Sequence, residues 1–208
     1  MCETLLYHYE NDPSILDNIW FSDEAVFHLS GRVNRHNTRI WGTENSKVIE
    51  EKERDSLKLV VWCAISAKGI ICPYFFRDDA RSTATVTGEN YLEMLEKVFP
   101  LELENNALVE NCYFQQDEAP AHYARKVRDY LNQVFPDRWI GCRDPLEWAA
   151  HSPDLTPCDF FLWGFLKSKV YSTRPQNLEE LEQKIRAACG LVTQDLLQSV
   201  RQECVKGG

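Results

Sequence analysis

The sequence lacks long hydrophobic stretches. No run of 18 apolar residues occurs, and the first residues do not show the basic and then apolar pattern of a secretory signal. Membrane insertion and export are therefore not indicated, and we expect the protein to stay inside the cell. Repeats, linkers and low-complexity segments are also missing. With 44% hydrophobic and 26% charged residues, the chain is expected to form a single domain over residues 1–208.

Metal-binding cysteine spacings are missing as well. The eight cysteines never fall two to four residues apart, and no close pair of histidines completes a zinc pattern. A metal–thiolate site is therefore not expected. We interpret the cysteines as reduced and mostly buried thiols. They are Cys2, Cys63, Cys72, Cys112, Cys142, Cys158, Cys189 and Cys204.

The sequence also has no excess of positive charge. Its 23 lysines and arginines face 32 aspartates and glutamates, which gives a net charge of -9. Nonspecific affinity for nucleic acid comes from lysine and arginine displacing phosphate counterions, so this balance argues against strong DNA binding by the chain alone. One local basic patch consists of Arg32, Arg35, His36 and Arg39. It is interpreted either as a contact to a phosphate backbone or as a solvated hairpin.

Strand patterns dominate the first third of the chain. β-Branched and aromatic residues predict strands over residues 19–29, 37–41, 57–65 and 69–76, and a short connection joins the last two. Apolar residues then recur at helical spacing between Thr87 and Pro100. This order predicts a meander of strands followed by a helix that crosses over the sheet.

The rest of the chain alternates between the two patterns. A short strand is predicted over residues 111–116, and Pro120 is expected to begin a helix. A last short strand over residues 138–142 precedes helices over residues 158–171, from Asn177 onwards and over residues 193–204. Strands and then alternating helices predict an α/β fold, a mixed sheet with helices on its faces.

Three aspartates stand where one sheet would bring them together. Asp23 lies in the first predicted strand, Asp117 directly after a later strand, and Asp159 at the start of a helix. Adjacent strands lie ~4.8 Å apart, so Asp23 and Asp117 would point into one crevice if their strands are neighbours. Three carboxylates are enough to hold Mg²⁺ or a similar hard cation. The set indicates a metal-dependent phosphoryl-transfer site.

Each aspartate also has a structural interpretation. Asp23, followed by Glu24, is compatible with the start of a turn, and Asp159 with a helix cap. Asp154 is a rival third acid, although its place beside a proline is more typical of a turn.

Other side chains near the aspartates have two interpretations as well. His122 follows Asp117 by five residues and is expected on the first turn of a helix. There it would contact substrate phosphate or a metal-bound water, or serve as a structural histidine. The aromatic residues around Asp159 are interpreted as core.

Three motifs, in this order, resemble the catalytic domain of mariner-like transposases. They are FSDEAVF (residues 21–27), QQDEAPAH (residues 115–122) and SPDLTPCDFFLWG (residues 152–164). The similarity extends over residues 15–197. Members of this family are cut-and-paste DNA transposases with a three-acid active site.

The resemblance implies a fold and a function. It implies a ribonuclease H-like mixed five-stranded sheet flanked by helices, with extra C-terminal helices. Asp23, Asp117 and Asp159 would be the catalytic metal ligands for Mg²⁺ or Mn²⁺, and Asp154 would be structural. The implied partners are DNA, at transposon ends and target, and a second copy of the chain within a full-length transposase. The implied location is the nucleus.

The chain also departs from the family pattern. Glu118 stands where relatives usually have glycine or asparagine, and it adds a charge beside the expected metal site as a possible accessory residue. The paired N-terminal helix-turn-helix domains of the family are absent from this sequence. These departures leave an alternative, a truncated or domesticated remnant that acts as a non-catalytic nucleic-acid- or protein-binding module. A host ribonuclease of the same fold is a third reading.

Overall fold

A computed structural model describes residues 9, 11–31, 57–78, 82–98, 112–141, 146–147 and 156–206. The strand expected at residues 37–41 lies outside these residues. So do Asp154 and the basic patch, Arg32, Arg35, His36 and Arg39. Among the helices within the described ranges, none is long and apolar enough to cross a membrane.

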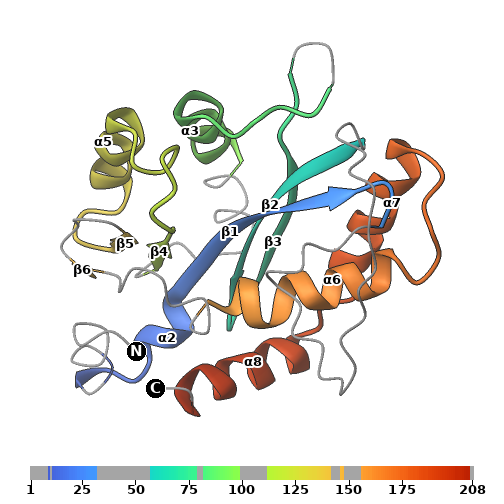
Figure 1. Cartoon of the computed structure of the whole chain (residues 1–208). Coiled ribbons are helices and arrows are strands. Elements are labelled where there is room, and N and C mark those ends of the chain that lie inside the picture. Colours follow the sequence, from blue (N-terminus) through green and yellow to red (C-terminus); the bar gives the residue numbers. More distant parts are fainter. Residues whose placement is uncertain are drawn as a thin grey trace, which may run out of the picture.

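A mixed sheet with strand order β3-β2-β1-β4-β5-β6 forms the centre of the fold (Figure 1). β1 (Ile19–His28), β2 (Lys58–Ser66) and β3 (Gly69–Phe75) are antiparallel neighbours. β4 (Tyr113–Gln115), β5 (Trp139–Gly141) and β6 (Leu146–Glu147) extend the sheet from β1 by parallel pairing. The predicted mixed sheet is confirmed, and β6 adds a sixth strand of two residues to the five expected.

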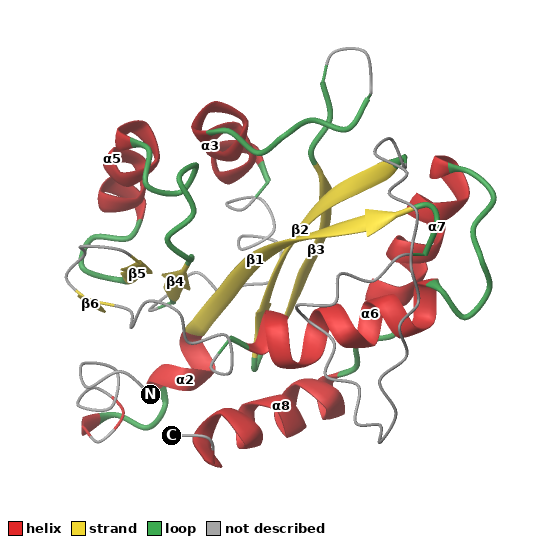
Figure 2. Cartoon of the chain, in the orientation of Figure 1, coloured by secondary structure: helices red, strands yellow, loops and turns green. Residues whose placement is uncertain are grey.

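Helices cover both faces of the sheet (Figure 2). α3 (Gly88–Lys97) and α5 (Arg125–Val134) pack on one face, and α6 (Trp163–Val170), α7 (Leu178–Cys189) and α8 (Gln194–Lys206) on the other. Because successive strand residues point to opposite faces, β1 contributes Trp20 to the first core and Phe21 and Phe27 to the second. β1 is therefore covered on both faces, and it follows the short helix α2 (Ile15–Asn18) directly.

Capping side chains set the beginnings of two predicted helices. The Thr87 hydroxyl accepts the backbone N–H of Asn90 at the start of α3, and the Asn90 side chain accepts the N–H of Thr87. At the start of α7, the Asn177 side chain accepts the N–H of Glu180 at 2.8 Å. Each contact satisfies a backbone donor that the helix itself leaves without a partner. Both helices are confirmed.

The predicted start of the middle helix at Pro120 is wrong. α5 begins at Arg125, and the preceding residues form separate turns, in which the N–H of His122 bonds to the Ala119 carbonyl. The Asp117 carboxylate accepts the N–H of Ala119 at 2.9 Å. Such side-chain contacts to nearby backbone compete with helix formation. His122 consequently lies in a turn and not on the first turn of a helix.

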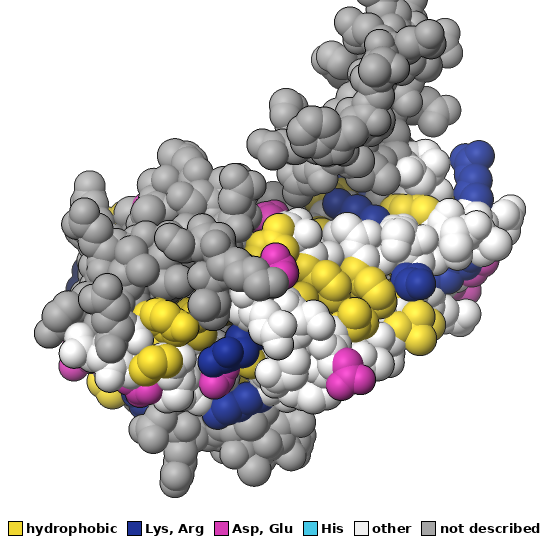
Figure 3. Space-filling view, turned by 90° about the horizontal axis from the view of Figure 1, so that it is seen from below, with side chains coloured by type: hydrophobic (Ala, Val, Ile, Leu, Met, Phe, Trp, Pro, Cys, Tyr) yellow, Lys and Arg dark blue, Asp and Glu magenta, His cyan; other side chains and the backbone are white. Residues whose placement is uncertain are grey.

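Positive charge is not concentrated on the face seen from below Figure 1. Figure 3 shows lysine and arginine side chains scattered there among hydrophobic and acidic ones, as far as the described residues cover this face. This agrees with the net charge of -9.

Candidate active site

The pairing of β1 with β4 brings the first two aspartates to one edge of the sheet. The two strands run in parallel, with Phe21 opposite Gln115. Asp23 and Asp117 each lie two residues further along the chain, Asp23 within β1 and Asp117 just beyond the end of β4. The strands that carry and precede the two aspartates, β1 and β4, are therefore neighbours, as the prediction of a shared crevice required. The alternative in which Asp23 and Glu24 begin a turn is wrong, because both lie within β1.

Asp23 is held from the side by the α6 helix. The Trp163 indole N–H donates a hydrogen bond of 2.6 Å to its Oδ2 atom. Burial, followed by the negative charges of Glu24 and Asp159, raises the pKa of Asp23 well above its ordinary value. A carboxylate whose neighbours are also negative is stabilised in its charged form by a nearby cation. Its environment therefore favours a bound positive charge.

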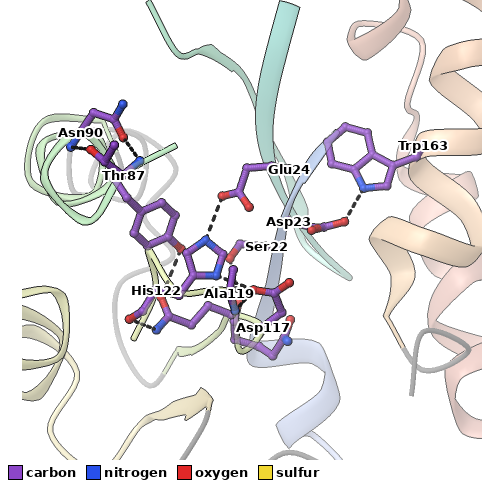
Figure 4. Close-up of polar contacts among 12 residues, drawn as sticks. Ser22, Asp23, Glu24, Thr87, Asn90, Asp117, Ala119, His122 and Trp163 are labelled. Carbon is purple, nitrogen blue, oxygen red and sulfur yellow. Dashed lines mark hydrogen bonds and ion pairs between the residues drawn. The ribbon is translucent and has the colours of Figure 1, made fainter. Parts of the chain in front are cut away.

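Asp117 is oriented by a buried histidine. The Nδ1 atom of His122 lies 2.5 Å from Asp117 Oδ1, and Nε2 lies 3.2 Å from Glu24 Oε1. The ring is 1% exposed and packs against the tilted ring of Tyr91, with ring centroids 4.1 Å apart. Figure 4 shows Glu24 pointing towards His122, and Asp23 pointing away from it towards Trp163. One histidine thus joins the carboxylate after β4 to a carboxylate on β1.

The two carboxylates keep this histidine charged. Burial alone would lower the pKa of His122, but the Glu24 charge and the hydrogen bonds to Asp117 and Glu24 outweigh it and raise the pKa to about 10. Desolvation opposes ionisation of Asp117, yet the hydrogen bond and charge of His122 lower its pKa. Both ring nitrogens therefore carry protons at neutral pH and donate to Asp117 and Glu24.

Asp159 lies on the face of the sheet that α6, α7 and α8 cover. It lies on the π-helical turn η3 (Cys158–Leu162), which leads directly into α6. Burial and the negative charge of Asp117 raise its pKa, while Lys167 opposes the rise. Single π-helical turns are frequent at functional sites. The fold thus brings together three aspartates that are far apart in the sequence.

The aspartates form an oxygen donor set of the kind that hard divalent cations prefer. Both hydrogen bonds to Asp117 use Oδ1, so within the described residues its Oδ2 is left available. The Asp159 carboxylate likewise accepts no hydrogen bond from a described residue. The donor set fits Mg²⁺ or Mn²⁺ in its chemistry.

The three carboxylates do not converge on one point. Within the described ranges, no group of three possible ligand atoms that includes an aspartate lies within 4.8 Å. Two oxygens on one such ion lie at most ~4.2 Å apart. Binding of one cation by all three aspartates therefore requires their side chains to rotate. The Asp23 carboxylate, for example, would rotate away from the Trp163 indole.

Several residues at this site were missed by sequence reasoning. Trp163 belongs to the core as predicted, but its indole nitrogen also reaches Asp23. Lys167 lies near Asp23 and Asp159, and burial lowers its pKa. Both residues follow Asp159 at helical spacings of four and eight, a signal that places them on the same helix face.

Glu24 was missed for a different reason. Strand alternation turns it to the face opposite Asp23, so its partner His122 is visible only in the fold. Glu118, by contrast, is exposed and makes no ion pair with another described residue.

One curated relative has a similar sequence. The Tc3 transposase of Caenorhabditis elegans is 30% identical over 155 residues, which covers 73% of this chain and 42% of that protein. The chain therefore spans less than half the length of this relative. No protein-family model matches the sequence.

Solved structures of Mos1 transposase share the fold. A Mos1 paired-end complex with the left transposon end matches with a TM-score of 0.73 and 21% identity, over 99% of this chain and 59% of that chain. The Mos1 catalytic domain matches with a TM-score of 0.68 and 21% identity, over 99% of this chain and 89% of that one. The predicted fold class is confirmed by this likeness.

Proposed function

Because the chain belongs to the mariner-like transposases, we propose that it is a metal-dependent DNA-cleaving catalytic domain. It hydrolyses phosphodiesters at transposon ends and joins the freed 3′ ends to target DNA by cut-and-paste transposition. The observation that supports this proposal is electrostatic: Asp23, Asp117 and Asp159, from β1, the end of β4 and η3, lie near enough for Asp159 to raise the pKa of Asp23 and for Asp117 to raise that of Asp159.

In this proposal the three aspartates hold Mg²⁺ or Mn²⁺. Mos1 catalytic domain structures exist with Mn and with Mg, which supports the same ions here. When bound, a pair of divalent cations activates the attacking oxygen and stabilises the leaving oxygen of a phosphodiester. The raised pKa values of Asp23 and Asp159 support this assignment, because a cation would offset the mutual repulsion of the acids.

The other residues of the site position these ligands. His122 holds Asp117 by Oδ1, and Oδ2 accepts no hydrogen bond from a described residue. Trp163 holds Asp23, and Lys167 places a positive charge near Asp23 and Asp159. Outer-shell hydrogen bonds of this kind orient metal-binding carboxylates. We therefore assign positioning roles to His122, Trp163 and Lys167.

The proposed partners are transposon ends and target DNA. Mos1 was solved as a paired-end complex and as a strand transfer complex, which supports a nucleic-acid substrate for this fold. A homodimer within a full-length transposase and a nuclear location belong to the same proposal. Arg32, Arg35 and Arg39 are proposed DNA contacts on the strength of their charge alone.

Nicking of supercoiled plasmid DNA tests the proposed function. The purified chain is incubated with Mg²⁺ or Mn²⁺, and nicked product is measured over time. Asp117→Asn should lower the rate at least about 100-fold, because it removes a metal-binding carboxylate. Asp129→Asn changes an acid on the surface of α5, 68% exposed, and should leave the rate unchanged. Equal nicking by wild type and Asp117→Asn would show that the activity does not arise at this site.

A further inference from the structure

Three cysteines meet on the face of the sheet that α7 covers. Cys63 lies on β2, Cys72 on β3, and Cys189 is the last residue of α7. Their sulfur atoms all lie within 4.8 Å of one another, and this is the one such group of possible metal ligands among the described residues. All three thiols are free.

An irregularity in the sheet puts the first two thiols on the same side. The register between β2 and β3 shifts between Trp62 and Ala64, so that Cys63 faces the segment of Cys72. Cys63 and Cys72 both contact the core beneath α7. A β-bulge re-aims side chains in this way and is common near functional sites.

The α7 helix supplies the third thiol. Leu181, Ile185 and Ala188 bury one side of this helix in the same core. This packing brings the end of α7, and with it Cys189, against β2 and β3. Each of the three sulfurs therefore has its position set by buried backbone and not by a surface loop.

The spacing of the sulfurs suits a metal ion. A metal–sulfur bond of ~2.3 Å places two sulfurs on one ion ~3.8–4.0 Å apart. The sulfurs lie within 4.8 Å of one another, so side-chain movements of about 1 Å or less bring them to that spacing. A disulfide needs the much shorter approach of ~2.05 Å, and it would leave the third sulfur without a role.

The three thiols differ in how readily they ionise. Hydrogen bonds from Cys63 and Cys72, with a smaller contribution from the Arg186 guanidinium, lower the pKa of Cys189. Burial raises the pKa of Cys63, and the hydrogen bond with Cys189, together with burial, raises the pKa of Cys72. Arg186 lies one turn before Cys189 and is held in place over the Phe75 ring, 4.9 Å from its centroid. Arg186 also pairs with Glu182 at 2.9 Å, so only part of its positive charge is available to the sulfurs.

We propose that Cys63, Cys72 and Cys189 form a second metal site, which binds one thiophilic d¹⁰ ion, Zn²⁺ or Cu⁺. Soft thiolates select such ions, whereas the carboxylates of the aspartate site select hard ones. Three sulfurs alone complete the coordination of Cu⁺. Zn²⁺ takes a fourth ligand, and Cys72, the most exposed of the three, lies where water can supply it.

The site would fasten α7 to the β2–β3 hairpin. Its ligands come from these three elements, which also meet through apolar contacts and through Arg186 over the Phe75 ring. Cys63 is also the cross-strand partner of Asp23, so the metal would brace the strand beside the first acid of the candidate active site. Its role is structural and separate from phosphodiester cleavage.

Metal binding to the reduced full chain tests this proposal. After removal of metal by a chelator, Zn²⁺ is titrated against a competing indicator, and Cu⁺ in a separate anaerobic titration against a Cu⁺ chelator. Co²⁺ serves as a probe, since its thiolate charge-transfer absorption reports sulfur ligands. We expect one equivalent of Zn²⁺ or Cu⁺, and a rise in Tm of roughly 5–10 °C at 100 times Kd. The two titrations show which ion binds more tightly.

Matched variants assign the binding to this cluster. Cys72→Ser, at the least buried ligand, should abolish the equivalent of bound metal and the rise in Tm. Cys204→Ser changes another partly buried cysteine outside the cluster and should change neither. Asp117→Asn should still bind metal at the three cysteines. A failure of the cysteine site can therefore be distinguished from a failure of the proposed aspartate site.

Two results would overturn the proposal. One is unaltered metal binding by Cys72→Ser. The other is a wild-type chain that binds neither ion while its thiols are reduced, as shown by a thiol count.

Discussion

Replacing Glu24 by glutamine tests the polar network that orients Asp117. The substitution keeps the shape of the side chain but removes one of the two carboxylates beside His122. The Glu24 charge is the largest influence that raises the pKa of this histidine against the effect of burial. The variant should therefore bind the imidazole proton less tightly in the folded state and lose stability.

The structure sets the size of this loss. The pKa of His122 rises from its ordinary value of 6.5 to about 10 on folding. One pKa unit corresponds to about 1.4 kcal/mol, so the charged imidazole contributes at most about 4 kcal/mol at pH 7. Asp117 still pairs with His122 in the variant. We expect Glu24→Gln to remove about half of the contribution of the charged imidazole, which lowers the free energy of unfolding by about 2 kcal/mol at pH 7.

The pH dependence gives the sign of the effect. Because the folded-state pKa is raised, the stabilisation by His122 is complete below pH 6.5 and is lost as the pH rises through about 10. Between these values the folded protein binds one more proton than the unfolded chain. Over this pH range, the titration of His122 should lower the wild-type free energy of unfolding by about 1.4 kcal/mol for each unit of pH increase. In the variant the folded-state pKa of His122 is lower, so this decrease should end at a lower pH.

Urea unfolding in metal-free buffer, followed by tryptophan fluorescence at a series of pH values, measures both quantities. Glu93→Gln makes the same chemical change on α3, where the side chain is 54% exposed, and should alter stability by less than about 0.5 kcal/mol. The reasoning is refuted if Glu24→Gln and wild type show the same stability and the same pH slope. His122 would then not depend on Glu24 for its charge.

Three further substitutions test the surroundings of the site by urea unfolding. Trp163→Phe removes the hydrogen bond to Asp23 and should lower the free energy of unfolding by about 1–3 kcal/mol; an unchanged value would mean that the bond is not formed in solution. Gly88→Ala should destabilise by about 1–3 kcal/mol, because the new Cβ would lie 2.5 Å from that of Ala124. Gly164→Ala, whose Cβ meets no atom within 4 Å, should instead stabilise α6 by up to about 1 kcal/mol, so a loss there would contradict the open space.

Local patterns predicted most of the described fold. β-Branched and aromatic residues predicted β1, β2 and β3, because such side chains pack well on the pleated surface of a sheet. The capping residue Asn177 predicted the start of α7 from a contact only three residues long. The beginning of α5 was mispredicted because the Asp117 side chain forms a local turn that competes with the helix.

The candidate active site was partly visible in the sequence. Asp23, Asp117 and Asp159 stand out because they lie within a predicted strand, directly after a predicted strand and at the start of a predicted helix, and their order matches a known motif set. The partners that hold them were not visible. Glu24 reaches His122 only across the pairing of β1 with β4, and Trp163 reaches Asp23 only across the packing of α6 on the sheet.

The sequence by itself determined the class of fold and the order of its elements, since both depend on neighbouring residues and their periodicity, and the resemblance of its motifs singled out three candidate acids. Tertiary structure alone decided which side chains meet. Cys63, Cys72 and Cys189 have no metal-binding spacing along the chain, yet a register shift between two strands and the burial of one helix face bring their sulfurs together. Such contacts depend on strand register and helix packing, which no local pattern encodes.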